Sequence, residues 1–272
     1  ENNSNTGNGM NDQPFSLGFD YKSNNPAAFF SGSIASARLS YGQYDQADVN
    51  FNYYGGNIVT DGLVFAVDAG NLVSYESGST TAYSLTGSAD GTLNNGVGFS
   101  SGNGGTWEFD GVDDYINMGT GLLNLQNASF SLEAWIKWDG GSEDTFFGYV
   151  YTGAPNQNIH WRIYPSGALR FDFYADSINS SAGSIVVDEW THLLVTYDYT
   201  TDTCICYKNG NILMQGSAGP FTGIDASSTA YLGSWGSNQY YGGDLSTFKA
   251  YNKALTAAEV TQNYNANINR FN

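Results

Sequence analysis

Alternating apolar and polar residues predict β-strands along most of the chain after residue 57. The clearest strand covers residues 129–138, where Phe130, Leu132, Ala134, Ile136 and Trp138 share one face. Shorter alternating or apolar runs occur at 63–67, 107–110, 114–118, 160–164, 169–173, 190–197, 204–208, 212–214, 230–233 and 244–251. Many short strands separated by turn residues predict an all-β protein built as a two-sheet antiparallel sandwich.

Two hairpins and one helix are also marked in the sequence. The run 165–167 (Pro-Ser-Gly) and the run 209–211 (Asn-Gly-Asn) each separate two strand patterns, and Asn-Gly is a strong signal for a tight hairpin turn. Near the end, Thr256 and Glu259 form a capping box, which predicts a short C-terminal helix ending near Tyr264. Its apolar positions, Val260 and Tyr264, are expected to pack on the sandwich.

The N-terminal part of the chain divides into two segments. Residues 1–15 are polar and rich in Asn, and we expect them to be a flexible segment. Residues 16–56 resemble the C-terminal segment: Phe29–Ile34 aligns with Tyr240–Leu245, and Asp45–Val49 aligns with Thr256–Val260 at the same offset. We interpret 16–56 as a partial repeat, the closing strands and helix of a preceding domain of the same kind. Chance similarity in a chain rich in Tyr and Gly is the alternative.

Composition and charge exclude several classes of protein. The 272 residues include 16 Phe, 6 Trp and 20 Tyr, enough to build a core. The net charge is −17 with only 9 Lys and Arg, so the basic surface of a nucleic-acid-binding protein is missing. No apolar run approaches the ~18 residues of a membrane span, so we expect no membrane insertion. Cys204 and Cys206 point the same way on a strand and are expected to be buried, unpaired thiols.

Residues 57–272 resemble the LamG-like (laminin-G-like, pentraxin-like) concanavalin A-type jelly-roll domains. The stretches that carry the resemblance are 61–70, 109–116, 129–137, 190–198, 207–210 and 251–260, in the family order. The resemblance implies a jelly roll whose members mostly bind glycans or proteins, often with Ca²⁺ at a sheet rim, while a minority are glycoside hydrolases. This variety is similar to domains of phage structural proteins and large bacterial surface proteins.

The acidic residues do not form the pattern of a glycoside hydrolase. Such enzymes use two carboxylates facing each other across a cleft. Glu133 stands alone in its strand, and Glu108 and Asp110 share a face without a third acid in register. His192 lies within an apolar strand, where a core histidine is the simpler interpretation. We therefore expect the protein not to be an enzyme.

One turn contains candidate calcium ligands. Asp110, Asp113 and Asp114 lie beside Gly111, and Asp68 ends the first strand of the domain. Calcium takes six to eight oxygen ligands, many of them from turns. The alternative is that these aspartates only hold the turn through hydrogen bonds to the backbone.

Two segments have the composition of a sugar site. Aromatic rings stack on the apolar faces of sugars, and amides or carboxylates bind the hydroxyl groups. The alternative is packing in the core or in a subunit interface. The candidate glycan-binding residues are Trp235, Asn238, Gln239, Tyr240 and Tyr241 in one segment, and Tyr151, Asn158 and Trp161 in the other.

The leading hypothesis is a non-enzymatic structural or adhesive module on a virion or cell surface. It would be a decoration, fibre or appendage protein that packs against other copies of itself or neighbouring subunits and contacts cell-surface glycans weakly and multivalently. The second hypothesis is a Ca²⁺-dependent lectin or adhesin of a bacterial surface, and the third is a glycoside hydrolase. No nucleic-acid partner is expected.

Overall fold

The described part of the chain forms two stacked antiparallel sheets and one α-helix. The computed structural model describes residues 56–121, 125, 127–141, 144–150, 157–174, 176–217, 219, 221, 228–236 and 238–272. The sheets and the C-terminal helix confirm the predicted all-β jelly-roll sandwich. The segment 1–15 and nearly all of the partial repeat 16–56 lie outside the described residues. The flexible segment and the partial repeat therefore stay predictions.

Sheet A takes strands from both ends of the domain. Its order is β14-β13-β12-β7-β16-β5-β4, and β1 also pairs with β16. The bounds of its strands are β1 Leu63–Asp68, β4 Gly98–Ser100, β5 Thr106–Asp110, β7 Phe130–Trp138, β12 Trp190–Asp198, β13 Thr203–Lys208, β14 Asn211–Gly216 and β16 Gly242–Tyr251. A short 3-10 turn, η2 (Gly102–Gly104), precedes β5.

Sheet B contains most of the middle of the chain. Its order is β11-β10-β9-β8-β15-β6-β3-β2. The bounds of its strands are β2 Thr81–Ala82, β3 Gly91–Asn94, β6 Tyr115–Thr120, β8 Asp144–Val150, β9 Ile159–Ile163, β10 Leu169–Asp172, β11 Ser177–Asn179 and β15 Thr229–Leu232. Both predicted hairpins are present, β9–β10 and β13–β14. Asn209 and Gly210 both have the positive φ that the tight turn needs.

The core lies between the two sheets and is aromatic. Phe147 of sheet B stacks on Phe248 of sheet A with ring centroids 4.6 Å apart. Burying each such ring removes enough apolar surface from water to stabilise the fold by roughly 1.5–3 kcal/mol. The apolar positions of β7 point into this core, as the alternating pattern predicted. Cys204 and Cys206 are buried free thiols, which also confirms their prediction.

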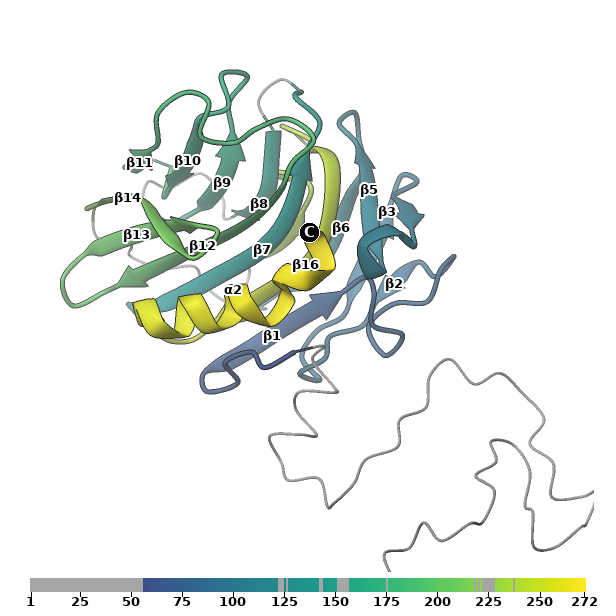
Figure 1. Ribbon diagram of the computed structural model, residues 1–272, viewed down its shortest axis with the longest axis horizontal. Coiled ribbons are helices and arrows are strands. Elements are labelled where there is room, and N and C mark those ends of the chain that lie inside the picture. Colours follow the sequence, from purple (N-terminus) through teal and green to yellow (C-terminus); the bar gives the residue numbers. More distant parts are fainter. Residues whose placement is uncertain are drawn as a thin grey trace, which may run out of the picture. The chain divides into compact units, whose positions relative to one another are not determined.

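The outer face of sheet A is covered by the helix α2 (Ala257–Phe271), which lies in front of the sheet in Figure 1. Trp135, on the outer face of β7, stacks on Tyr264 at 5.8 Å and on Phe271 at 4.2 Å. The capping box of Thr256 and Glu259 is present as predicted. The helix nevertheless runs on to Phe271 instead of ending near Tyr264. Its Asn-rich last turns have poor helix propensity, and packing on sheet A supplies the stability that propensity lacks.

A buried polar cluster lies between α2 and sheet A. Glu133 of β7 is fully buried and binds Lys249 of the neighbouring strand β16 and Asn263 of the helix. His192 is also fully buried, with Nε2 3.4 Å from the Glu133 carboxylate, as expected for a core histidine. Burial raises the pKa of Glu133, but the Lys249 ammonium and His192 outweigh burial and hold that pKa well below its usual range.

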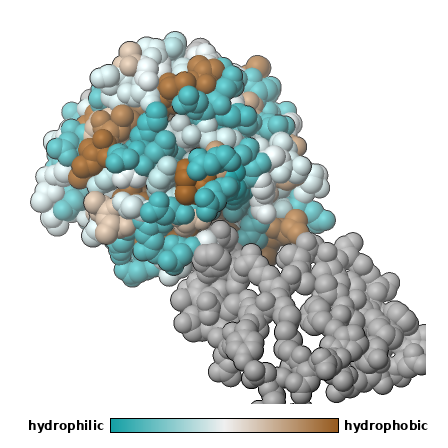
Figure 2. All heavy atoms as spheres, viewed as in Figure 1, coloured by the Kyte–Doolittle hydropathy of each residue, from teal (hydrophilic) through white to brown (hydrophobic). Residues whose placement is uncertain are grey.

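The described surface exposes a few large apolar residues, among them Leu72, Val73 and Val112. On the face seen in Figure 2, hydrophobic residues form small separate patches among hydrophilic ones. No helix in the described ranges is long and apolar enough to cross a bilayer.

Candidate functional site

The outer face of sheet B carries a row of polar side chains. Trp161 of β9 and Phe171 of β10 point into the core and are fully buried. Because side chains alternate along a strand, the residues beside them lie on the opposite face. The resulting polar row consists of His160 and Arg162 on β9, and Arg170 and Asp172 on β10.

Two aromatic rings cover one end of this row. Trp235, in the segment that follows β15, lies over His160 with ring centroids 3.8 Å apart. Tyr174, just after β10, stacks on Trp235 at 5.8 Å and is 45% exposed. Gly148 of β8 makes this close approach possible, because a Cβ there would lie 2.5 Å from the Ser234 carbonyl oxygen and 2.9 Å from the Cα of Trp235.

Tyr174 is held in an unfavourable backbone conformation. Its φ is +81°, in a region that bulky residues rarely adopt and that costs roughly 1–3 kcal/mol. Its N–H donates to Asp172 Oδ1 at 2.8 Å, which helps to fix the turn. Backbone strain of this kind is concentrated at ligand-binding sites. This turn places the ring of Tyr174 at the surface, where it is 45% exposed.

One carboxylate organises the charges of the row. Arg170 donates through Nε to Asp172 Oδ2 at 2.8 Å, and Arg162 donates through Nη2 to the same oxygen at 3.4 Å. Arg170 also donates through Nη1 to the Tyr164 hydroxyl at 2.9 Å. Two guanidinium groups thus share one carboxylate and are fixed at the surface, ready to donate to a ligand.

His160 is neutral at physiological pH. Burial lowers its pKa to about 4, and Arg162 and Arg170 add to that lowering while Asp172 opposes it. A neutral imidazole offers one donor and one acceptor. Within the described residues, no hydrogen bond reaches either ring nitrogen or the indole N–H of Trp235.

A second aromatic group lies on the same face. Tyr115 of β6 packs against Tyr231 of β15 at 5.8 Å and against Tyr240 at 6.5 Å. Gln239 connects the two groups, since its Oε1 accepts from Arg162 Nη1 at 3.4 Å. We call the whole set the sheet B surface: His160, Arg162, Arg170, Asp172, Tyr174, Trp235 and Gln239 with the three tyrosines.

Some of the predicted sugar-binding residues lie on the sheet B surface and others do not. Trp235, Gln239 and Tyr240 belong to it, and Asn238 is exposed in the same loop. The prediction for Trp161 and Tyr241 was wrong, because both rings are fully buried and contact Phe146 in the core. Asn158 is fully buried as well, so it cannot meet a ligand at the surface. Tyr151 lies outside the described residues.

Sequence reasoning missed most of the polar row. His160, Arg162, Arg170 and Asp172 were recognised as strand residues but not as neighbours on one face. The hairpin at 165–167 with alternation on both sides carries that information. The position of Tyr174 depends on an irregular turn, for which the sequence holds no comparable signal.

The predicted calcium ligands separate into two groups. Carboxylate oxygens of Asp110, Asp113 and Asp114 lie within 4.8 Å of one another. Asp110 Oδ1 accepts three backbone N–H groups, which lowers its pKa and holds the turn. Burial raises the pKa of Asp114, whose Oδ1 has no hydrogen-bond partner within the described chain. That oxygen suits a cation, so calcium at this turn remains a prediction.

Asp68 does not join these three aspartates. Both of its carboxylate oxygens bind the Arg270 guanidinium, at 2.8 and 2.9 Å. The prediction of Asp68 as a calcium ligand was therefore wrong, because a cation from the end of α2 already occupies its carboxylate. The sequence could not show this pairing between positions so far apart.

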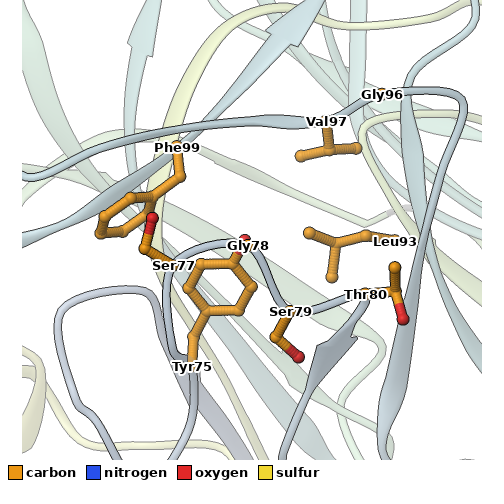
Figure 3. A pocket seen from close by; sticks show the side chains of 9 residues that line it. All are labelled: Tyr75, Ser77, Gly78, Ser79, Thr80, Leu93, Gly96, Val97 and Phe99. Atoms are coloured by element: carbon orange, nitrogen blue, oxygen red, sulfur yellow. The ribbon is translucent and has the colours of Figure 1, made fainter.

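A separate pocket of about 350 Å³ opens near β3 and the edge strand β4, and Figure 3 shows its lining residues. The rings of Tyr75 and Phe99 and the side chains of Leu93 and Val97 give it an apolar lining. Hydroxyl groups come from Ser77, Ser79 and Thr80. None of its described lining residues carries a charged or amide side chain, so it has fewer means of orienting a polar ligand than the sheet B surface.

Comparison with known proteins supports the fold. The family model of the concanavalin A-like lectin/glucanases superfamily matches residues 110–261, more than half of the chain. This match agrees with the resemblance found in the sequence. No curated protein sequence matches the chain.

Several solved structures share the fold at low sequence identity. Domain 4 of AbnA, a GH43 extracellular arabinanase from Geobacillus stearothermophilus solved with arabinotriose, is 18% identical with a TM-score of 0.58, covering 73% of this chain and 96% of the domain. The binding domain of Paraclostridial Mosquitocidal Protein 1 is 19% identical with a TM-score of 0.55, covering 75% and 52%. Trypanosoma rangeli sialidase is 14% identical with a TM-score of 0.57, covering 76% of this chain and 33% of the sialidase. The chain thus spans about a third of the sialidase and half of the mosquitocidal domain.

Proposed function

The chain belongs to the concanavalin A-like lectin/glucanases superfamily, and from this premise we propose that it is a non-catalytic carbohydrate-binding module whose site is the sheet B surface. The observation that carries the proposal is the exposed ring of Tyr174, stacked on Trp235 beside fixed hydrogen-bond donors and acceptors. An exposed aromatic ring with convergent polar groups is the general form of a sugar site.

The binding mode follows from the positions of these groups. A sugar ring would stack on Tyr174 and on the accessible part of Trp235. Its hydroxyl groups would accept from Arg170, whose Nε and Nη1 are already fixed by Asp172 and Tyr164. Because these side chains are held before the ligand arrives, little side-chain entropy is lost on binding. The arabinanase domain solved with arabinotriose makes arabino-oligosaccharides a sensible first probe.

Binding without hydrolysis fits the chemistry of the surface. Glycoside hydrolysis generally needs two carboxylates, about 5–9.5 Å apart. Asp172 is the only carboxylate of the sheet B surface as defined above, and two arginines engage it. A carboxylate held in this way orients a ligand better than it attacks one.

The proposal extends to where the module works. Weak contacts of one module become effective when several copies act together, because each further contact is then intramolecular. This gain in overall affinity favours an extracellular or virion-surface appendage that displays repeated copies of the domain.

A binding survey with matched variants tests the site. The chain would be screened on immobilised arabinan, xylan, β-glucan, polygalacturonate and sialylated glycans, with calorimetry for each positive. We expect Trp235→Ala and Tyr174→Ala to weaken binding by tenfold or more, equivalent to about 1.4 kcal/mol. Tyr83→Ala is the matched control, because Tyr83 is similarly exposed (49%) on another part of the domain.

The pocket of Figure 3 supplies the competing outcome. Ser77 is exposed at its rim, so Ser77→Trp would fill the pocket without disturbing the core. Binding lost with Ser77→Trp but kept with Trp235→Ala would move the site to that pocket. Absence of binding to every glycan would overturn the proposed function.

A further inference from the structure

The cluster beneath α2 brings a lysine and an asparagine to one carboxylate. Lys249 Nζ lies 2.8 Å from Glu133 Oε1, and Asn263 Nδ2 donates to Glu133 Oε2 at 2.5 Å. The three residues come from β16, β7 and α2, so the carboxylate lies at the junction of two strands and the helix. An amine, a carboxamide and a bridging carboxylate are the groups required to form an amide bond between side chains.

Water is excluded from this cluster. Glu133 and Asn263 are fully buried, and Lys249 is 4% exposed. Trp135 lies two residues after Glu133, on the same outer face of β7. It lies beneath α2 and stacks on Tyr264. A dry site suppresses competing hydrolysis and strengthens each electrostatic interaction.

We propose that Lys249 and Asn263 form an intramolecular isopeptide bond, with Glu133 as the proton-transferring residue. The bond would tie β16 to α2 covalently. It involves neither the sheet B surface nor glycan binding, so it stands apart from the proposed function.

Each group has a role in the reaction. Lys249 Nζ is the nucleophile, and Glu133 Oε1 takes its proton. The Val59 N–H donates to Asn263 Oδ1 at 2.7 Å, which polarises the carbonyl and stabilises the oxyanion of the tetrahedral intermediate. The departing Asn263 Nδ2 lies at Glu133 Oε2 and 2.8 Å from the Tyr251 hydroxyl oxygen.

Atoms and charges balance in the reaction. One proton moves from the Lys249 ammonium to the Glu133 carboxylate, which leaves a neutral amine and a neutral acid. The amine nitrogen bonds to Asn263 Cγ, and a proton from that nitrogen passes through Glu133 to Nδ2. The Cγ–Nδ2 bond then breaks, ammonia leaves, and Glu133 keeps one proton. No oxidant, reductant or cofactor is needed.

Loss of ammonia drives the reaction toward the product. Lys249 and His192 outweigh burial at Glu133 and hold its pKa well below its usual range, so the ion pair is stable and the neutral amine forms only rarely. The product replaces both ions by a neutral amide and a neutral acid, and escape of ammonia makes the step irreversible. Because the ion pair is the resting state, the reaction is slow, but it has to occur once only. Holding both groups on one carboxylate avoids the entropy cost of bringing them together from solution.

The mass of the intact, purified chain tests the proposal. We expect it to be lower than the sequence mass by one ammonia molecule. Asn-Gly sequences such as Asn209-Gly210 can also lose ammonia by forming a succinimide. Tryptic mapping distinguishes the two, because the isopeptide gives a branched peptide that joins Lys249 to Asn263 with no cleavage after Lys249. A chain of full sequence mass without that peptide overturns the proposal.

Three variants sharpen the test. Asn263→Asp should lose one water instead of one ammonia, which a structural role of Asn263 cannot produce. Glu133→Gln should abolish the branched peptide, and Lys253→Arg should leave it intact, because Lys253 binds Asp61 and Glu259 near the surface and arginine keeps the tryptic site between Lys249 and Asn263. A branched peptide that persists in Glu133→Gln would contradict the role given to Glu133.

Discussion

The end of α2 is anchored by one arginine, and replacing it gives a sharp prediction. Arg270 binds both carboxylate oxygens of Asp68, at 2.8 and 2.9 Å. It also donates to the Gly105 carbonyl, the Ser246 hydroxyl and the Asn103 carbonyl at 3.0, 2.8 and 2.7 Å. Arg270→Met keeps much of the side-chain volume but removes every one of these donors.

The magnitude follows from burial. The side chains of Asp68 and Arg270 are 8% and 18% exposed, so the variant leaves a nearly buried carboxylate without its cation. Breaking a fully buried pair costs about 3–5 kcal/mol. Partial exposure of Arg270 reduces this, and we expect a loss of about 2–4 kcal/mol in the free energy of unfolding. Guanidinium chloride titrations followed by tryptophan fluorescence measure it, with the denaturant slope unchanged.

Two controls separate the anchor from general charge effects. Lys253→Met breaks surface pairs with Asp61 and Glu259, which should be worth no more than about 1 kcal/mol. A double-mutant cycle of Arg270→Met with Asp68→Asn should give a coupling energy of about 1–3 kcal/mol. The reasoning is refuted if Arg270→Met costs no more than Lys253→Met.

Three further predictions concern titration, calcium and thiols. Burial raises the pKa of Asp144 to about 6 from 3.8, so the folded state binds this proton more tightly than the unfolded chain. The free energy of unfolding of the wild type should therefore fall relative to that of Asp144→Asn as the pH rises from 4 to 6. A difference that does not depend on pH would contradict this. Calcium at millimolar concentration should raise the melting temperature, and Asp114→Asn should remove the increase; an unchanged melting temperature in wild type would sink the calcium prediction. Burial raises the pKa of Cys204 and Cys206, so both should resist a disulfide reagent until the protein is unfolded, and rapid reaction of the native protein would disprove it.

Regular patterns allowed the sheets to be predicted. Alternation identified β7, and the Asn209-Gly210 turn fixed the β13–β14 hairpin, because both depend on residues close in sequence. The capping box at Thr256 located the start of α2. The end of α2 was not predictable in the same way, because its last turns depend on contacts with sheet A.

The sheet B surface was predicted only in part, for a related reason. Aromatic and amide composition identified Trp235 as a surface candidate but gave the same weight to Trp161, which is a core residue. Strand alternation separates these cases only once the register of β9 is known. The stacking of Tyr174 on Trp235 joins two loops that are distant in sequence. Composition cannot encode such a contact.

The position of α2 also determines how the domain carries mechanical load. Leu63 of β1 pairs with Tyr251 of β16, so the two strands leave the sheet at the same end. Pulled at that end, they would open like a zipper, one hydrogen bond at a time. Instead, α2 runs back along sheet A, and Arg270 binds Asp68 at the far end of β1. Gly56 lies against Ala266 in the last turns of α2, so tension between Gly56 and Phe271 first loads these turns, and β1 and β16 come under load only after Arg270 has left Asp68.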